Sequence, residues 1–286
     1  MTAQDSADSQ LRKLFQNSLD SHGHGFHAAV AETLRRQALV LSNLTIIGTE
    51  VPVTVQGQDT RVDILFGSKG GDFYVAAECK RVDPALSNWC FVKSRPLAMD
   101  RYDAAVVADG LYNSQGTPVA RVYECGTVHD FAHIGVETRS SKPGDGSPSG
   151  RGRDIEGAVT QALRGTNGLI NLLNSNVQYL VAGVHAVFVP TVFTTAQLWL
   201  SAVDLKEAEL LNGHIDLSKG SFSEVDFVVL QYHQSQGLRH DLKIAPSRDG
   251  LESYLREQSA RSVVIANTKH LGKWVELMNI LQMTRR

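Results

Sequence analysis

The fold is decided by residues 62–80, which read VDILFGSKGGDFYVAAECK. Both ends of this stretch are apolar and rich in Val, Ile and aromatic residues, whereas its middle is rich in Gly, Ser and Asp, a pattern typical of a β-hairpin. A two-residue turn at Gly70 and Gly71 sets the register of the strands, because glycine accepts the positive φ angles of tight hairpin turns. In that register Asp63 lies directly opposite Glu78.

This hairpin is predicted to gather charge on one face. Directly opposed residues have Cβ atoms about 4.5–5.5 Å apart, and Lys80, two residues after Glu78, points to the same face. Cys79 points to the other face, where we expect a buried, unreactive thiol. Two carboxylates at this spacing repel each other unless a cation lies between them. A divalent metal ion beside Asp63 and Glu78 is therefore the simplest interpretation.

An Asp near the end of one strand followed by Glu-x-Lys on the next, here Asp63 and residues 78–80, resembles the PD-(D/E)XK nuclease superfamily and its Holliday-junction-resolvase-like active site. Val62 stands where the motif often has proline. The resemblance covers residues 26–80 and, more loosely, 154–190. It implies a restriction-endonuclease-like fold of the α/β class, with a mixed β-sheet core flanked by helices in the order α-β-β-β-α-β.

The resemblance also implies an activity, that of a Mg²⁺-dependent DNA endonuclease in restriction or phage defence. Mg²⁺ prefers oxygen ligands and takes one or two carboxylates together with water and substrate phosphate, so Asp63 and Glu78 are the expected ligands, with Mn²⁺ as a substitute ion. Lys80 would orient the attacking water and stabilise the anionic transition state. Glu32, on the preceding helix, would complete the metal shell, and Gln161, on a later helix, would contact phosphate or a metal-bound water.

Other interpretations remain open at this stage. Glu32 can equally be a solvated residue paired with Arg35 or Arg36, and a surface position is the ordinary one for Gln161. The chain could also be a catalytically inactive module of the same fold that binds nucleic acid or a partner protein, or a nuclease directed at RNA. Since cutting two DNA strands takes two sites, we expect a homodimer.

Composition is that of an ordinary globular protein, with 286 residues, 42% hydrophobic and 20% charged. The net charge of −2 gives no global field for nucleic acid, so basic side chains must cluster locally. Three cysteines form no disulfide framework, and with a polar N-terminus they favour a reduced, cytoplasmic setting. Residues 177–203 lack charge, but Pro190 and several polar residues divide them, which favours two buried strands over a membrane helix.

We expect a single elaborated domain. Its core spans about 26–83 and 154–205, with an insertion at about 84–153 and a C-terminal extension at about 206–286. Cys125, His129 and His133 follow one another at four-residue steps, but structural zinc needs a fourth ligand, so we interpret them as a core cysteine and surface histidines. The expected strands lie at 45–55, 103–108, 119–126, 177–189, 194–203, 225–231 and 262–266, and the expected helices at 10–18, 26–41, 154–174, 250–258 and 270–283.

Overall fold

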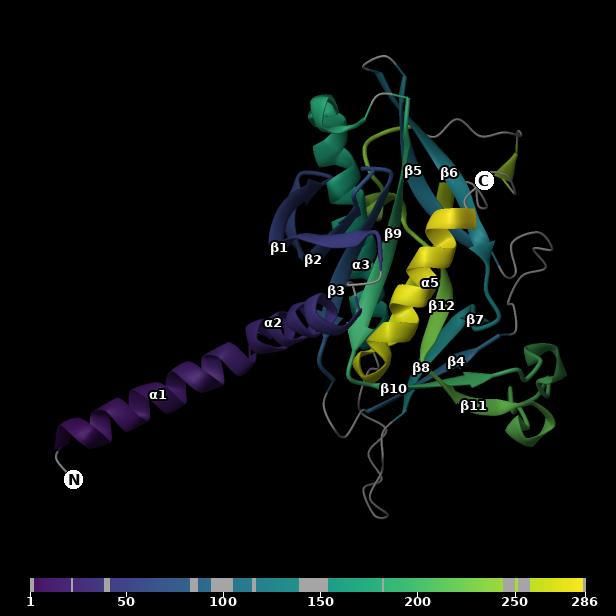
Figure 1. Ribbon diagram of the computed structural model, residues 1–286. Helices are drawn as coiled ribbons and strands as arrows, with labels where there is room; N and C mark the ends of the chain where they lie inside the picture. The colour runs from purple at the N-terminus through teal and green to yellow at the C-terminus, as the bar shows by residue number, and fades with distance from the viewer. Residues whose placement is uncertain are drawn as a thin grey trace.

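The structure is a computed structural model that describes residues 3–21, 23–38, 42–82, 87–93, 105–114, 117–138, 154–181, 183–243, 250–251 and 258–284. This part of the chain forms a mixed α/β fold in which a large, twisted sheet carries helices on its faces (Figure 1). The expected α/β class is therefore confirmed.

The large sheet has nine strands in the described residues. The first three strands form an antiparallel meander, and the chain then returns through a helix to a strand parallel to the third. The strand order across the sheet is β1 (Leu44–Val55), β2 (Gln58–Ser68), β3 (Phe73–Lys80), β9 (His185–Thr194), β13 (Ala260–Asn267), β12 (Phe227–His233) and β7 (Phe131–Ala132). Off this path, β5 (Ala105–Ser114) pairs with β9 and with β6 (Thr117–Thr127).

A second, four-stranded sheet lies at one end of the molecule (Figure 1). Its order is β11 (Phe222–Val225), β10 (Gln197–Ser201), β4 (Asn88–Val92) and β8 (Ile134–Thr138). Short 3₁₀ turns connect the other elements at Val177–Tyr179, Leu205–Glu207, Leu217–Lys219, Gln236–Leu238 and Thr268–His270.

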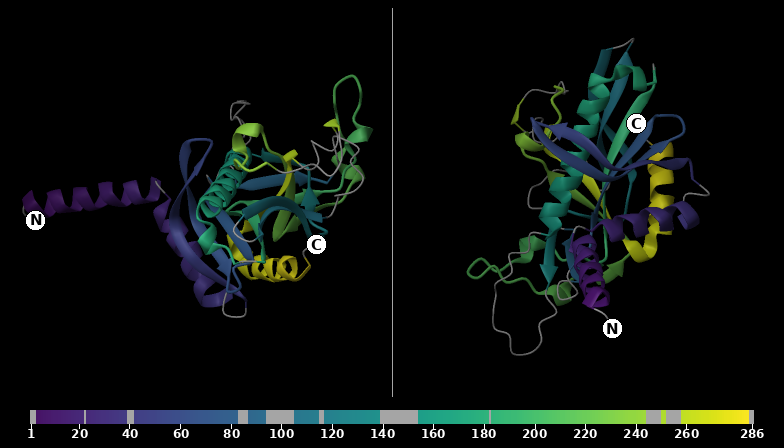
Figure 2. Two further views of the ribbon diagram at one scale, coloured as in Figure 1. Left: turned by 90° about the horizontal axis from the view of Figure 1, so that it is seen from above. Right: turned by 90° about the vertical axis from the view of Figure 1, so that its left-hand side faces the viewer.

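Helices cover both faces of the large sheet. On one face α2 (His24–Thr33), which continues as a π-helical turn over Leu34–Ala38, packs together with α5 (Leu271–Thr284) against a common apolar core. On the other face α3 (Asp154–Ser175) lies across the first strands. In contrast, α1 (Ala3–Ser21) projects away from the body, as Figure 1 and the left view of Figure 2 show.

Two glycines let α3 approach the sheet closely. A Cβ atom at Gly168 would lie 2.6 Å from Cγ2 of Val53, and one at Gly165 would lie 3.1 Å from Cγ2 of Val62. Such short separations cannot accommodate a side chain without movement of strand residues. Glycine has a low helix propensity, but at these two positions it lets α3 lie close to β1 and β2.

The register expected for the hairpin is confirmed, because Ile64 pairs with Ala77 and Gly67 pairs with Tyr74. The two-residue turn is not what forms, since β2 ends at Ser68 and β3 begins at Phe73. The Ser68 hydroxyl oxygen accepts hydrogen bonds from the backbone N–H groups of Asp72 and Phe73, both at 3.1 Å, and closes the ladder instead. Cys79 faces the apolar core as expected, with 7% exposure.

The described residues of segment 84–153, which was expected to be an insertion, form strands. This segment supplies β5 and β7 to the large sheet, while the C-terminal segment supplies β12 and β13. The described residues of both segments therefore complete the sheet.

The strand break expected at Pro190 is wrong, because β9 runs through it. On the edge of β9 away from β3, residues 185–188 pair with β5 and residues 191–194 pair with β13. Pro190 lies at this change of partner, where its missing N–H removes no ladder hydrogen bond.

The helix expected over residues 250–258 lies largely outside the described residues. Among the described helices, none has both the length and the apolar character needed to cross a bilayer.

Candidate functional site

Three carboxylates form a row across three neighbouring strands. Pairing of Thr49 with Ile64 and of Val51 with Val62 sets Glu50 on β1 opposite Asp63 on β2. The β2–β3 ladder sets Asp63 opposite Glu78 on β3. The row thus depends on strand register and not on proximity in sequence.

Asp63 and Glu78 form the buried centre of this row. The Asp63 side chain accepts a hydrogen bond from the Cys79 backbone N–H at 2.7 Å, and its carboxyl group also hydrogen-bonds to that of Glu78. Burial is the main cause that raises the pKa of Glu78 to about 8, and the Asp63 charge is the second cause. Burial also raises the pKa of Asp63. The two groups therefore share a proton near neutral pH unless a cation replaces it.

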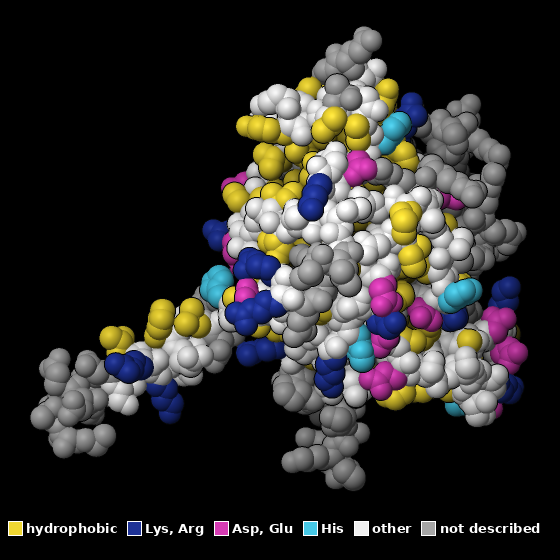
Figure 3. Space-filling view, viewed as in Figure 1, with side chains coloured by type: hydrophobic (Ala, Val, Ile, Leu, Met, Phe, Trp, Pro, Cys, Tyr) yellow, Lys and Arg dark blue, Asp and Glu magenta, His cyan; other side chains and the backbone are white. Residues whose placement is uncertain are grey.

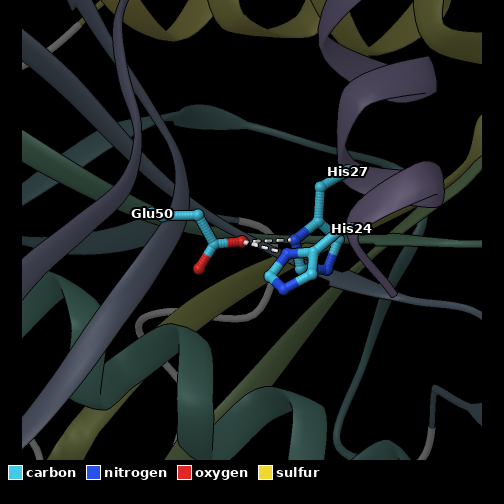
Figure 4. Close-up of side chains that lie close together, drawn as sticks. All are labelled: His24, His27 and Glu50. Carbon is cyan, nitrogen blue, oxygen red and sulfur yellow. Dashed lines mark hydrogen bonds and ion pairs between the residues drawn. The ribbon is translucent and has the colours of Figure 1, made fainter. Parts of the chain in front are cut away.

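Helix α2 places a histidine over the row. His27 Nδ1 lies 2.8 Å from Glu50 Oε1, and His27 Nε2 lies 3.3 Å from Asp63 Oδ2. His24, one turn earlier on the same helix, has its Nδ1 3.5 Å from the same Glu50 oxygen. Figure 4 shows both rings turned from α2 towards Glu50 on the facing strand. His27 thus links Glu50 with the buried carboxyl pair.

Lys80 connects the row to α3. Its Nζ lies 3.1 Å from Oδ1 of Asp154, the first residue of that helix, and its charge acts to lower the pKa of Glu78. The side chain is 32% exposed, so the amine that acts on the Glu78 charge is also open to solvent. The helix start is capped from elsewhere, because the Ile155 N–H donates to Glu137 Oε1 at 2.6 Å. Asp154 is therefore available to hold Lys80.

The other two expected site residues lie elsewhere. The Glu32 carboxylate binds Arg35 at 2.7 Å and also Arg36, as in the alternative left open by the sequence, and the Arg36 hydrogen bond is the main cause that lowers the Glu32 pKa. Gln161 is exposed on α3. Among the contacts found in the described residues, neither side chain joins Asp63 or Glu78. The structure thus assembles Asp63, Glu78 and Lys80, and it brings His27 in place of Glu32.

Sequence reasoning missed both histidines. The available signal was their spacing of three residues at a helix start, which puts two side chains on one side of a helix. Glu50 lies on the first strand of the meander, and its partners could not be known without the register.

Basic side chains gather around this region (Figure 3), where the projecting helix joins the body. Arg61, 67% exposed, has its Nη1 3.9 Å from Glu50 Oε2. Local positive charge of this kind is what a protein with a net charge of −2 needs in order to bind a polyanion.

Two sets of metal donors therefore adjoin each other. Asp63 and Glu78 offer oxygen only, whereas His24, His27 and Glu50 offer two nitrogens and an oxygen with all three ligand atoms within 4.8 Å of one another. Cys125, His129 and His133 form no such group in the described chain.

A separate apolar hollow of about 470 Å³ lies on the small sheet, where Trp199 stacks on Phe222. No carboxylate or imidazole lines it, so it lacks the donors found at the row.

Comparison with family models, with curated proteins and with solved structures gave no significant match.

Proposed function

We propose that this chain is a metal-dependent endonuclease that hydrolyses phosphodiester bonds in DNA, with Mg²⁺ or Mn²⁺ held by Asp63 and Glu78. The observation that carries the proposal is the buried, opposed carboxyl pair with Lys80 on the same strand and face. A restriction or phage-defence role and a homodimeric assembly belong to the proposal through the resemblance described above.

The donor set suits a hard divalent ion. Two carboxyl groups that hydrogen-bond to each other, and whose pKa values are raised, cannot both ionise cheaply without a cation. When bound, such an ion lowers the pKa of its water and neutralises charge on the scissile phosphate. Asp63 is already oriented by the Cys79 N–H, so little reorganisation of the chain is needed.

The chain's own groups supply the remaining functions. Lys80 is aimed by Asp154 and can donate hydrogen bonds to the attacking water and to the developing negative charge. Arg61, at the exposed rim of the row, can contact the nucleic-acid backbone without reading its sequence.

The topology also supports a restriction-endonuclease-like core. The order α2, β1, β2, β3, α3, β9, with β9 parallel to β3, follows the α-β-β-β-α-β pattern once the strands between β3 and α3 are set aside.

Plasmid nicking tests the proposal. Wild type, Asp63→Asn and Lys80→Ala are incubated with supercoiled DNA and Mg²⁺ or Mn²⁺, and Lys69→Ala, in the exposed hairpin turn, is the matched control. We expect both site variants to lose roughly 100-fold or more in rate, the scale seen when one transition-state donor is removed, while the control nicks like wild type.

Each contrary result points to another function. Absence of nicking by folded wild type with either ion would favour an inactive module that binds nucleic acid or a partner. Cleavage of RNA but not of duplex DNA would make the chain an RNA-directed nuclease. Full activity in both folded site variants would refute the site assignment.

A further inference from the structure

Beside the carboxyl pair, a second donor group is formed by His24, His27 and Glu50 (Figure 4). We propose that these three side chains bind a transition-metal ion of borderline softness, with Zn²⁺ as the reference ion, so that the centre accepts two different kinds of divalent ion. The idea that one centre holds both Zn²⁺ and Mg²⁺ rests on the proposed function. Binding of Zn²⁺ at the three residues can be tested without catalysis.

The spacing of the donor atoms fits a tetrahedral ion. With Zn–N bonds of 2.0–2.1 Å, ligand atoms around zinc are about 3.3 Å apart. Glu50 Oε1 lies 2.8 Å from Nδ1 of His27 and 3.5 Å from Nδ1 of His24, which brackets that value. The His24 ring is 51% exposed and can turn to close the remaining separation.

The donor types distinguish this group from the carboxyl pair. Two imidazoles and one carboxylate, with a fourth position for water or substrate, are a ligand set of catalytic zinc sites. Imidazole suits Zn²⁺ and other transition metals, while Mg²⁺ prefers oxygen and keeps its water. The two adjoining donor sets are therefore expected to select different ions.

The His27 ring is held as a metal-ligating imidazole usually is. Its Nε2 lies 3.3 Å from Asp63 Oδ2, while its Nδ1 faces the other donors. A carboxylate on the far nitrogen fixes the tautomer and raises the basicity of the ligating nitrogen. Asp63 is itself fixed by the Cys79 N–H, so the ring is oriented through two successive contacts.

The backbone also aims the donors at the cost of strain. Glu50 has a φ of 52°, in the left-handed region that non-glycine residues rarely adopt. Helix α2 begins after Gly23, whose φ is 73° and where a Cβ would lie 3.2 Å from Nε2 of His27. Glycine adopts this φ without strain, whereas a strained residue such as Glu50 is of the kind that concentrates at functional sites and ligand clamps.

An ion pair alone accounts for only part of the arrangement. A proton on His27 would satisfy the two carboxylates that flank its ring. It would not explain why His24, half exposed, is directed at the same oxygen, because an exposed ion pair contributes little in water. A shared ion explains the convergence of all three side chains.

Metal binding to the full chain, freed of ions with a chelator, tests the proposal. Co²⁺ serves as the optical probe and Zn²⁺ as the calorimetric titrant, and Mg²⁺ is followed separately by thermal stabilisation. We expect one Zn²⁺ to bind and His24→Gln or Glu50→Gln to weaken it roughly 100-fold, at the upper end of the loss caused by disturbing a metal site's surroundings. His214→Gln, at an exposed histidine outside the group, is the matched control and should bind like wild type.

The two donor sets are separated by opposite variants. His24→Gln should lose Zn²⁺ affinity and keep stabilisation by Mg²⁺, whereas Glu78→Gln should lose the Mg²⁺ effect and keep a Zn²⁺ site. Equal Zn²⁺ affinity in wild type, His24→Gln and Glu50→Gln, or a Co²⁺ spectrum without nitrogen ligation, would overturn the inference. Zn²⁺ binding through these residues without nicking by any ion would leave the inference standing and refute the proposed function.

Discussion

Replacing Glu78 by glutamine should stabilise the metal-free protein at neutral pH, although it removes a proposed metal ligand. Burial and the Asp63 charge raise the pKa of Glu78 to about 8, against about 4.3 for an unfolded glutamate. The folded state therefore holds a proton that the unfolded state has released. The stability due to this proton is fully present below about pH 4 and is lost as the pH rises through about 8.

The slope follows from proton linkage. Between the two pKa values the free energy of unfolding falls by about 1.36 kcal/mol per pH unit. From pH 5.5 to 7.5 the wild type should thus lose about 2.7 kcal/mol relative to Glu78→Gln. Glutamine mimics the protonated acid and does not titrate, so the two proteins should have similar stability near pH 4 and diverge as the pH rises.

Urea unfolding in the presence of a chelator measures this difference, with fluorescence of the buried Trp89 and Trp274 as the signal. Glu276→Gln, at an exposed acid paired with Lys273, is the control and should keep the wild-type pH profile. Adding Mg²⁺ at pH 7.5 should stabilise the wild type and not Glu78→Gln. Parallel stability profiles for wild type and Glu78→Gln across this pH range would refute the shared-proton account of the carboxyl pair.

Two further predictions concern the scaffold that positions the row. Gly168→Ala should lower the free energy of unfolding by about 1–2 kcal/mol, because the clash with Val53 outweighs a helix-propensity gain of up to about 1 kcal/mol. Gly157→Ala is the control on the same helix, and it should stabilise the protein because the space around its Cβ is open. Urea unfolding measures both variants. Arg261→Leu should cost about 3–5 kcal/mol, because it removes the two-nitrogen contact of Arg261 with the buried Asp109 and leaves only His240 beside that carboxylate. The double variant with Asp109→Leu should recover most of that loss, and equal losses in single and double variants would contradict the assignment.

Local patterns allowed part of the site to be predicted. Alternation of side chains and the glycine-rich turn were enough to set Asp63 opposite Glu78, because a ladder carries register along its length even when the turn differs. Cys79 was placed correctly by the same alternation. Gln161 and Glu32 were assigned by resemblance, and side-chain position depends on competing partners. Glu32 has arginines three and four residues later on its own helical segment, where ion pairs form readily.

The position of Glu50 in the site depends on a β-bulge at Ile47, which no local pattern reveals. Leu44–Ile46 pair with β2 in one register, and from Gly48 onward the register has moved by one residue. The bulged residue, Ile47, lies over Gly67, where a Cβ would meet its Cδ1 at 2.4 Å. Without this shift Thr49 would oppose Asp63, and a one-residue slip sends every side chain to the other face. The bulge therefore puts Glu50 in line with Asp63 and beneath the histidines of α2, which is why the mixed nitrogen and oxygen donor group exists in the fold and was hidden in the sequence.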